Sequence, residues 1–275
     1  MDTVNLLGLS FDNLTVPEAV TRLLERSPAS PFVYVVTPNA DHIARLSRVR
    51  ELVPVYEEAW LCLLDSHVIA NFARLFGVPA PKVSTGTDVT ALLLSSLLIQ
   101  DVAIIGFNPL HLPALRERCP TTNFILHTPP MNLLKNPVAF AAARDFAVET
   151  KARFTLIGLG SPLQELLAQS IAAAPNATGI GLCIGGALEF CSGVAPRAPV
   201  WMQRAGLEWF HRLVRNPRRL ARRYLIENPP VLFSLAYEGL RSSWLAVSRH
   251  RISPAPVRPE KRARWPEISR LPDDP

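Results

Sequence analysis

Short apolar runs alternate with longer segments of helical periodicity along the first two thirds of the chain. The runs cover residues 32–36, 61–64, 102–105, 124–126, 154–157 and 180–184. This alternation is typical of a parallel sheet that is covered on both faces by helices. The sequence therefore predicts an α/β fold with a Rossmann-like parallel sheet flanked by helices.

Helix signals fill the segments between these runs. Thr15, followed by Pro17 and Glu18, forms a capping-box pattern, so we expect a helix from there to residue 26. Apolar residues at helical spacing predict further helices over 41–50, 89–98, 139–151 and 164–174.

Polar residues and glycines follow the predicted strands, at the edge where folds of this kind bind ligands. Thr37 and Asn39 follow the first run, and Asp65 follows the second. The glycines after the later runs are Gly106, Gly158, Gly160, Gly185 and Gly186. Backbone N–H groups at such turns, and at the helix N-termini after them, bind phosphate groups. We therefore expect a ligand site along this edge.

Each of these residues also has a purely structural interpretation. An aspartate such as Asp65 at a strand end is typical of a helix cap as well as of a catalytic group, and Asn39 is typical of a turn. Gly158 and Gly160 lack the third glycine of a dinucleotide-binding fingerprint, and no Gly-Lys-Ser/Thr follows them. These spacings alone leave the ligand open.

Charge is distributed unevenly along the chain. Residues 1–195 carry 13 basic and 16 acidic side chains, whereas residues 196–275 carry 16 basic and 7 acidic ones. We therefore expect an α/β core over 1–195, a basic amphipathic appendage over 196–251 and a tail over 252–275. The tail is rich in proline, arginine and lysine, a composition typical of disorder.

The appendage mixes arginine with aromatic and aliphatic side chains. The spacing predicts that five arginines share one helical face, namely Arg215, Arg218, Arg219, Arg222 and Arg223. A basic residue near anionic lipid contributes about 1 kcal/mol to membrane binding, so this segment indicates docking on an anionic membrane surface. A solvated basic helix and a nucleic-acid-binding helix are the alternatives. Because no RNA- or DNA-binding motif accompanies the charge, we expect no nucleic-acid partner.

Composition narrows the class of protein further. With 275 residues and 48% hydrophobic residues, the chain has enough apolar surface for a large core. The N-terminus lacks an export-signal pattern, and every apolar run is far shorter than the roughly 20 residues that span a bilayer. We therefore expect a cytoplasmic protein with peripheral membrane contact. The cysteines and histidines form no CxxC or HxxxH pattern, so we expect reduced thiols and no metal site.

An ordered series of motifs carries a resemblance to a known family. TPNADHI begins at Thr37, TGTD at Thr85 and GLGSPLQE at Gly158, and Asp65 stands at a strand end between the first two motifs. A long motif, GGALEFCSGVAPRAPVWMQRAGLEWFHRLVRNPRRLARRY, begins at Gly185. From about residue 5 to about residue 233, this order resembles the WecG/TagA/CpsF glycosyltransferases, glycosyltransferase family 26.

The resemblance implies an inverting hexosyltransferase without metal or other cofactor. Such an enzyme moves a sugar from a UDP-sugar to a polyprenyl-diphosphate-linked saccharide in bacterial cell-surface or exopolysaccharide synthesis, on the inner face of the plasma membrane. It also implies self-association. The chain contains no Asp-x-Asp pair, so arginine, lysine and backbone donors would neutralise the diphosphate instead of Mg²⁺.

The resemblance also implies roles for single residues. Asp65 would be the general base, and the sugar and acceptor site would be lined by Thr37, Asn39, Gln164 and Glu165. Glu189, which stands where the family usually has aspartate, would lie near the nucleoside together with the glycine turns. The diphosphate or the membrane would be contacted by Lys82, Arg197, Arg204, Arg212, Arg215, Arg219, Arg222 and Arg223.

Three positions depart from the family pattern. Val83 replaces an arginine, Leu163 replaces a lysine, and Ser66 replaces the glycine after Asp65. Two positive charges near the diphosphate are therefore missing. These departures fit a changed donor sugar, and they also leave open a second interpretation. In that interpretation, the protein is a diverged, non-catalytic protein that binds a nucleotide sugar or a lipid diphosphate.

Overall fold

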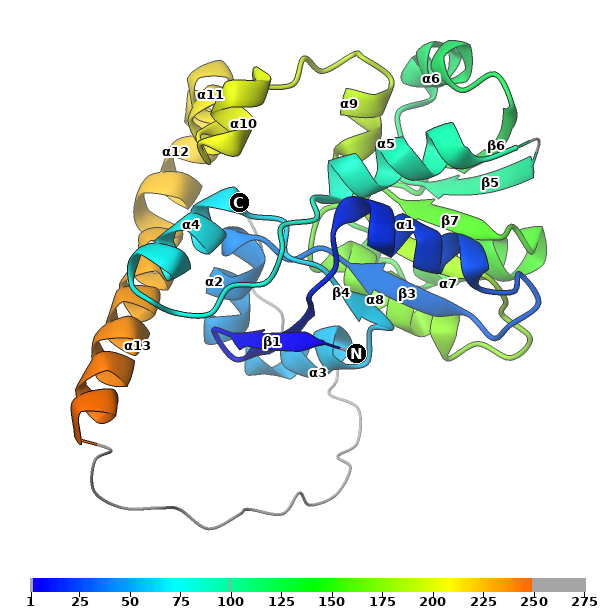
Figure 1. The fold of residues 1–275 in the computed structure, drawn as a ribbon. Coiled ribbons are helices and arrows are strands. Elements are labelled where there is room, and N and C mark those ends of the chain that lie inside the picture. Colours follow the sequence, from blue (N-terminus) through cyan, green and yellow to red (C-terminus); the bar gives the residue numbers. More distant parts are fainter. Residues whose placement is uncertain (1, 99, 249–275) are drawn as a thin grey trace.

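The centre of the protein is a six-stranded parallel sheet with the strand order β4-β3-β8-β7-β5-β6 (Figure 1). The strands are β3 (Val33–Val36), β4 (Leu61–Cys62), β5 (Gln100–Ile105), β6 (Thr122–His127), β7 (Phe154–Ile157) and β8 (Ile180–Cys183). The structure is a computed structural model that describes residues 2–98 and 100–248, so the expected tail lies outside the described residues. All six predicted apolar runs form this sheet, and the predicted fold class is confirmed.

The three strands β3, β8 and β7 end level with one another. Val36 and Ile157 are both in register with Cys183, the last residue of the strand between them. Every residue of β7 and β8 is buried, because helices cover both faces of the sheet. The loops after these strands therefore leave the sheet from neighbouring points of one edge.

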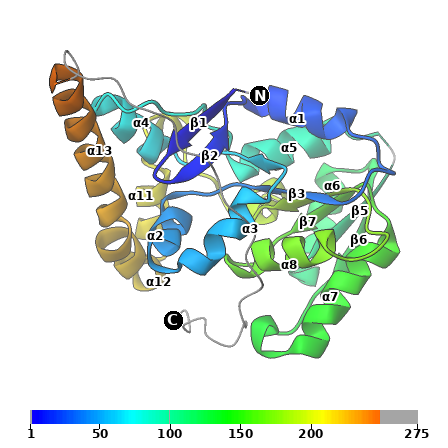
Figure 2. The ribbon, with the colours of Figure 1, turned by 90° about the horizontal axis from the view of Figure 1, so that it is seen from below.

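Helices form a layer on each face of the sheet (Figure 2). One layer consists of α1 (Val16–Glu25), α5 (Gly86–Ser96), α6 (Leu112–Arg118) and α9 (Ala187–Cys191). The other consists of α2 (Ala40–Arg48), α3 (Val53–Glu57), α7 (Pro137–Thr150) and α8 (Leu163–Ala172). Each layer buries its own apolar cluster, with Leu93 and Leu156 in the first and Ile157 and Leu167 in the second. Short 3₁₀ turns add η1 (Arg50–Leu52), η2 (Pro109–His111) and η3 (Leu133–Lys135).

The predicted helices form with ends that differ by up to three residues from those expected. The capping box of α1 is complete, because the Thr15 hydroxyl accepts from the Glu18 N–H and the Glu18 carboxylate accepts from the Thr15 N–H. The sequence interpretation did not anticipate a hairpin of β1 (Thr3–Leu6) and β2 (Leu9–Asp12). Its two turn residues, Leu7 and Gly8, have positive φ angles of 53° and 82°. Such a turn usually has Asn-Gly at these positions, and because Leu7 replaces the asparagine, the usual sequence signal is missing.

The appendage, residues 196–248 in the structure, is a series of helices. They are α10 (Val200–Arg204), α11 (Glu208–Arg215), α12 (Pro217–Arg222), a π-helical turn (Arg223–Glu227) and α13 (Pro229–Ser248). α13 packs against α2 and α4 (His67–Leu75). The contact with α4 is close at Gly239, where a Cβ would lie 2.4 Å from the carbonyl oxygen of Phe76.

The prediction of one helical face for the five arginines of the appendage is wrong. The chain leaves the helical conformation at Asn216, which has φ −137° and ψ 59°, and Pro217 starts a new helix. Proline cannot continue the hydrogen bonding of the preceding helix, although it fits the first turn of the next one. The arginines are therefore divided among α11, α12 and the π-helical turn.

Candidate active site

Three of the predicted glycine turns meet at the carboxyl edge of the sheet. A Cβ on Gly158 would lie 3.1 Å from the carbonyl oxygen of Gly106 and 3.3 Å from that of Gly185. Gly106 and Gly185 have positive φ angles of 85° and 51°. Glycine at these positions lets the loops after β5, β7 and β8 approach one another backbone to backbone.

The other residues predicted for the nucleotide lie near the outer surface of the same region. A Cβ on Gly160 would meet open space. Gly186 and Glu189 are exposed at the start of α9, and a Cβ on Gly186 would lie 3.7 Å from the Glu189 carboxylate. Glu189 is therefore accessible beside the glycine turn that follows β8.

Asp65 lies where β4 ends, beside the first turn of α5. Its backbone N–H donates to the Pro38 carbonyl at 3.0 Å, and its carboxylate accepts from the N–H of Gly86. The Thr37 hydroxyl donates to the Cys183 carbonyl at 3.1 Å and stands 2.9 Å from where a Cβ on Gly86 would be. Because Gly86 has no side chain, Thr37 and Asp65 both come close to the N-terminus of α5.

The environment of Asp65 is suited to a general base. Burial raises the pKa of its carboxyl to about 7; Glu208 contributes to the increase, whereas Arg212 and the Gly86 N–H oppose it. A base with a pKa near the working pH combines the correct ionisation state with a useful affinity for the proton. The alternative role as a helix cap belongs to the next residue, because the Ser66 hydroxyl accepts from the Ile69 N–H at 3.2 Å.

Asn39 caps α2, so its structural interpretation is the one that the geometry supports. Its side-chain oxygen accepts from the N–H of Asp41 at 3.0 Å and from that of His42 at 3.5 Å. The same oxygen lies 2.9 Å from Nδ1 of the His42 ring. The cap thus fixes the start of α2 and the orientation of His42.

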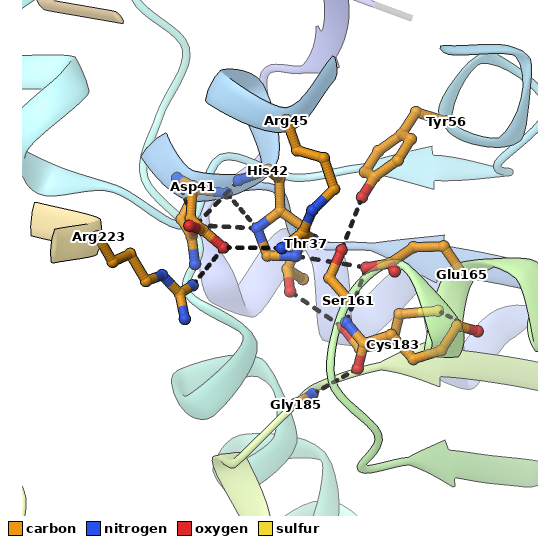
Figure 3. A network of polar contacts seen from close by, with 12 residues as sticks. Thr37, Asp41, His42, Arg45, Tyr56, Ser161, Glu165, Cys183, Gly185 and Arg223 are labelled. Atoms are coloured by element: carbon orange, nitrogen blue, oxygen red, sulfur yellow. Dashed lines mark hydrogen bonds and ion pairs between the residues drawn. The ribbon is translucent and has the colours of Figure 1, made fainter. Parts of the chain in front are cut away.

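A buried polar network joins α2, α8 and the glycine turn after β8 (Figure 3). Gln164 Nε2 donates to Glu165 Oε1 at 2.8 Å, and the Gly185 N–H donates to Gln164 Oε1 at 2.8 Å. His42 Nε2 lies 3.4 Å from the same Glu165 oxygen. An ionised carboxylate only accepts hydrogen bonds, so Glu165 fixes the orientation of the Gln164 amide and, through it, the Gly185 turn.

Glu165 is ionised although it is buried. Burial alone would raise the pKa of its carboxyl, but the hydrogen bonds and charge of His42, together with Gln164, hold that pKa below its usual value. The pKa of the nearby Tyr56 phenol is raised instead, by the burial of Tyr56 itself and, to a smaller extent, by the negative charge of Glu165. The Tyr56 hydroxyl therefore stays protonated and forms a hydrogen bond with the Ser161 hydroxyl at 3.2 Å.

Most of the predicted basic residues whose side chains are described form ion pairs. Arg197 pairs with Asp88 at 2.5 Å, Arg212 with Glu208 at 2.6 Å, and Arg223 with Asp41 at 2.5 Å. Lys82 pairs with Glu18 at 3.0 Å and Arg222 with Glu227 at 3.2 Å, while Arg215 is exposed. The side chains of Arg204 and Arg219 lie outside the described part of the chain. Among these residues, Arg197 and Arg212 are close enough to Asp65 for the charges to interact.

Sequence reasoning did not single out His42, Asp88 or Glu208. Each stands inside one of the ordered motifs, since TPNADHI contains His42, TGTD contains Asp88 and the long motif from Gly185 contains Glu208. Their position in these motifs is a usable sign that the three residues are important. The partners of these residues are far away in the sequence, however, so no local pattern indicated them.

The described residues contain neither a candidate metal site nor a candidate membrane-spanning helix. No group of three or more histidine, cysteine, aspartate or glutamate residues in that part of the chain is arranged to hold a metal ion. No helix within residues 2–98 and 100–248 is long and apolar enough to cross a membrane.

Comparison with known proteins gives two findings. The family model of the "Glycosyl transferase WecG/TagA/CpsF family" matches residues 4–244. A stretch of 67 residues is 45% identical to the "N-acetylglucosaminyldiphosphoundecaprenol N-acetyl-beta-D-mannosaminyltransferase" of Bacillus subtilis (strain 168). That stretch covers 24% of this chain and 25% of the relative.

Proposed function

Because the chain belongs to the WecG/TagA/CpsF family of glycosyl transferases, we propose that it moves a sugar from a UDP-sugar to a polyprenyl-diphosphate-linked saccharide. The observation that best supports this proposal is the position of Asp65. Its carboxyl group, with a pKa of about 7, lies beside Thr37 at the edge of the sheet where the glycine turns meet.

In the proposed reaction, ionised Asp65 accepts the proton of the acceptor hydroxyl as its oxygen attacks the anomeric carbon. The bond from that carbon to the UDP oxygen breaks, and UDP leaves with the electron pair. Attack on the face opposite the leaving group inverts the anomeric centre. A general base typically accounts for a factor of about 10²–10⁴ in rate.

Positive charge for the leaving diphosphate comes, in this proposal, from Arg197 and Arg212, and the reaction uses no divalent ion. Both guanidinium groups interact electrostatically with Asp65. Lys82 contributes less, because it pairs with Glu18 at the start of α1 and is not among the charges that shift the pKa of Asp65. The glycine turns and Glu189 bind the nucleotide, and Gln164 and Glu165 shape the turn at Gly185.

The relative's name suggests which substrates to test first. Its donor residue is N-acetylmannosamine, and its acceptor is N-acetylglucosaminyl-diphospho-undecaprenol. We propose the same chemical class of acceptor for this chain. The loss of positive charge at Val83 and Leu163 makes the donor sugar the more variable part of the proposal.

We further propose that the appendage docks on anionic lipid at the inner face of the plasma membrane. Its exposed side chains combine Arg215, Arg218 and Arg222 with apolar residues, namely Trp201, Phe210, Val214, Leu225, Ile226, Phe233, Tyr237 and Leu240. Changing Arg215, Arg219 and Arg222 to glutamate should reduce cosedimentation with anionic vesicles, and added salt should weaken it. Unchanged cosedimentation would exclude this surface as the membrane contact.

A second candidate function is binding without turnover. It is favoured by Val83 and Leu163, which pack as apolar residues against the core where the family carries positive charge. Under this candidate, the protein binds UDP but transfers no sugar to any lipid-linked acceptor.

The decisive experiment compares the unmodified protein with Asp65→Asn in a sugar-transfer assay. UDP-sugars are screened with the lipid-linked N-acetylglucosamine acceptor, with and without a chelator. We expect activity that is insensitive to the chelator and a loss of about 10²–10⁴ in Asp65→Asn with UDP binding retained. Asp101→Asn, an exposed carboxylate at the start of β5, is the matched control. Full activity in Asp65→Asn excludes Asp65 as the base, and UDP binding without transfer by the unmodified protein favours the second candidate.

A further inference from the structure

The guanidinium group of Arg212 is held from two sides. In its plane, Glu208 Oε1 accepts from Arg212 Nη2 at 2.6 Å and from Nε at 3.1 Å. Across its face, the ring of Phe190 lies 4.9 Å from the guanidinium carbon. A charged hydrogen-bond pair and a cation–π contact together restrict the arginine to one orientation.

The backbone brings α11 next to the end of β4. Gly206, two residues before α11, has a φ angle of 74° and packs on the first turn of α4. A Cβ on Gly206 would lie 3.3 Å from the N atom of Val68 and 3.5 Å from the carbonyl carbon of His67. Since α4 begins two residues after Asp65, this contact seats the start of α11 beside the proposed base.

Charged groups and one backbone N–H act on Asp65 from several elements. Arg212 and Glu208 face it from α11, His42 from α2, Arg197 from the loop before α10, and the Gly86 N–H from α5. Arg212 and His42 lower the pKa of Asp65, whereas Glu208 raises it. Within α11, the two opposite charges thus act on Asp65 in opposite directions.

We propose that Glu208 is a positioning residue: with Phe190 it directs Arg212 toward the leaving diphosphate and keeps this arginine from forming an ion pair with Asp65. The proposal rests on the function proposed above for Asp65. Its physical reason is competition between two carboxylates for one guanidinium group. Glu208 and Asp65 are the two carboxylates whose charges act on Arg212, so without Glu208 the base is the one that remains, and an ion-paired carboxylate is a weaker base.

The main test is Glu208→Gln, which keeps the size of the side chain and one acceptor but removes the charge. We expect kcat to fall roughly tenfold, because a misplaced arginine and a weaker base both slow transfer. The acidic limb of the pH–rate profile should move to lower pH by about one unit. Glu227→Gln is the matched control, because it removes the carboxylate partner of Arg222 in the same appendage. We expect its pH–rate profile to match that of the unmodified protein.

A titration of the Asp65 carboxyl by ¹³C NMR reads the same effect without any turnover. The signal is assigned by its absence in Asp65→Asn. We expect its midpoint to move down in Glu208→Gln and up in Arg212→Gln, because the two changes remove opposite charges. A midpoint that stays within about 0.3 units in Glu208→Gln would overturn the proposal.

The two variants also distinguish a failure of the proposal for Glu208 from a failure of the proposed function. If Glu208→Gln does not fold, the Arg212→Gln arm decides, and a midpoint that fails to rise there overturns the proposal. If the unmodified protein transfers no sugar, the proposed function fails, whereas the NMR midpoints still report whether Glu208 and Arg212 act on Asp65 in opposite directions.

Discussion

The α/β core and the appendage are stabilised in different ways. In the core, β7 and β8 are buried on both faces. The core helices α1, α2, α4, α5 and α7 begin with a side-chain cap, whereas α3, α6, α8 and α9 do not. In the appendage, α10, α11 and α12 begin without a side-chain cap. Among the appendage side chains that the structure describes, the large apolar Leu220, Val231 and Leu235 are buried, whereas ten others are exposed. We therefore expect local unfolding of the appendage to cost less free energy than local unfolding of the core.

The candidate active site lies where these two parts meet. Asp65 and Thr37 come from the core, while Arg212 and Glu208 come from the appendage. The core holds its own site residues by short hydrogen bonds, as at Gln164 and Gly185. The appendage contributes charges that are fixed only while its helices are seated. Opening of the appendage would therefore remove Arg212 and Glu208 from the site while leaving Asp65 and Thr37 in place.

The largest predicted effect concerns the stability of the core at high pH. The pKa of Asp65 is raised to about 7 in the folded protein, against about 3.9 in an unfolded chain. The folded state therefore binds the proton more tightly. The corresponding stability is complete below about pH 4, is lost as pH rises, and is absent above about pH 7. Asp65→Asn removes this loss, so at pH 8.5 the variant should be more stable by roughly 2–4 kcal/mol.

Urea unfolding of both proteins between pH 4 and pH 8.5 measures this difference. We expect the two free energies of unfolding to converge toward pH 4 and to separate as the pH rises. Asp101→Asn is again the control, because Asp101 is exposed and lies near the amino end of β5, away from the carboxyl ends of the strands. A difference in the free energy of unfolding that stays constant across this range would contradict a raised pKa of Asp65 in the folded protein.

The next effect separates the appendage from the core. A Cβ at residue 239 would lie 2.4 Å from the Phe76 carbonyl oxygen, which belongs to backbone and cannot turn aside. Gly239→Ala should therefore push α13 away from α4 at a cost of about 1–3 kcal/mol, despite the better helix propensity of alanine. Hydrogen exchange should become faster in α13 and stay unchanged in β7 and β8. Leu240→Ala, at an exposed neighbouring position, is the control; equal protection of α13 in both variants would contradict the packing.

The sequence predicted the sheet, because its strands follow from local signals. Apolar runs of strand length marked all six strands, and the capping box at Thr15 marked the start of α1. The same local signals failed at Asn216, where a regular arginine spacing continued across a break between two helices. Spacing reports which residues would share a face if the helix continued, and Pro217 was the evidence that it does not.

The contacts that assemble the site were not predictable in this way. His42 and Glu165 are separated by 123 positions, and Asp88 and Arg197 by 109. A charged residue in a motif shows only that a partner is needed, because a salt bridge has no sequence period. The choice among many possible carboxylates is made by the fold, and only the arrangement of the helices reveals it.

The smallest predicted effect tests the contact between the π-helical turn and α2. Asp41 is buried and accepts from Arg223 at 2.5 Å, while Arg45 of its own helix lies 3.6 Å away (Figure 3). Because Arg45 remains beside the carboxylate, Arg223→Gln should weaken the attachment of the appendage by only about 1 kcal/mol. Hydrogen exchange in residues 223–241 should then be about fivefold faster, with little change in the core, and added salt should reduce the difference between the proteins. Arg218→Gln, an exposed arginine of α12, is the control, and equal exchange in both variants would show that Arg223 does not hold the appendage in place.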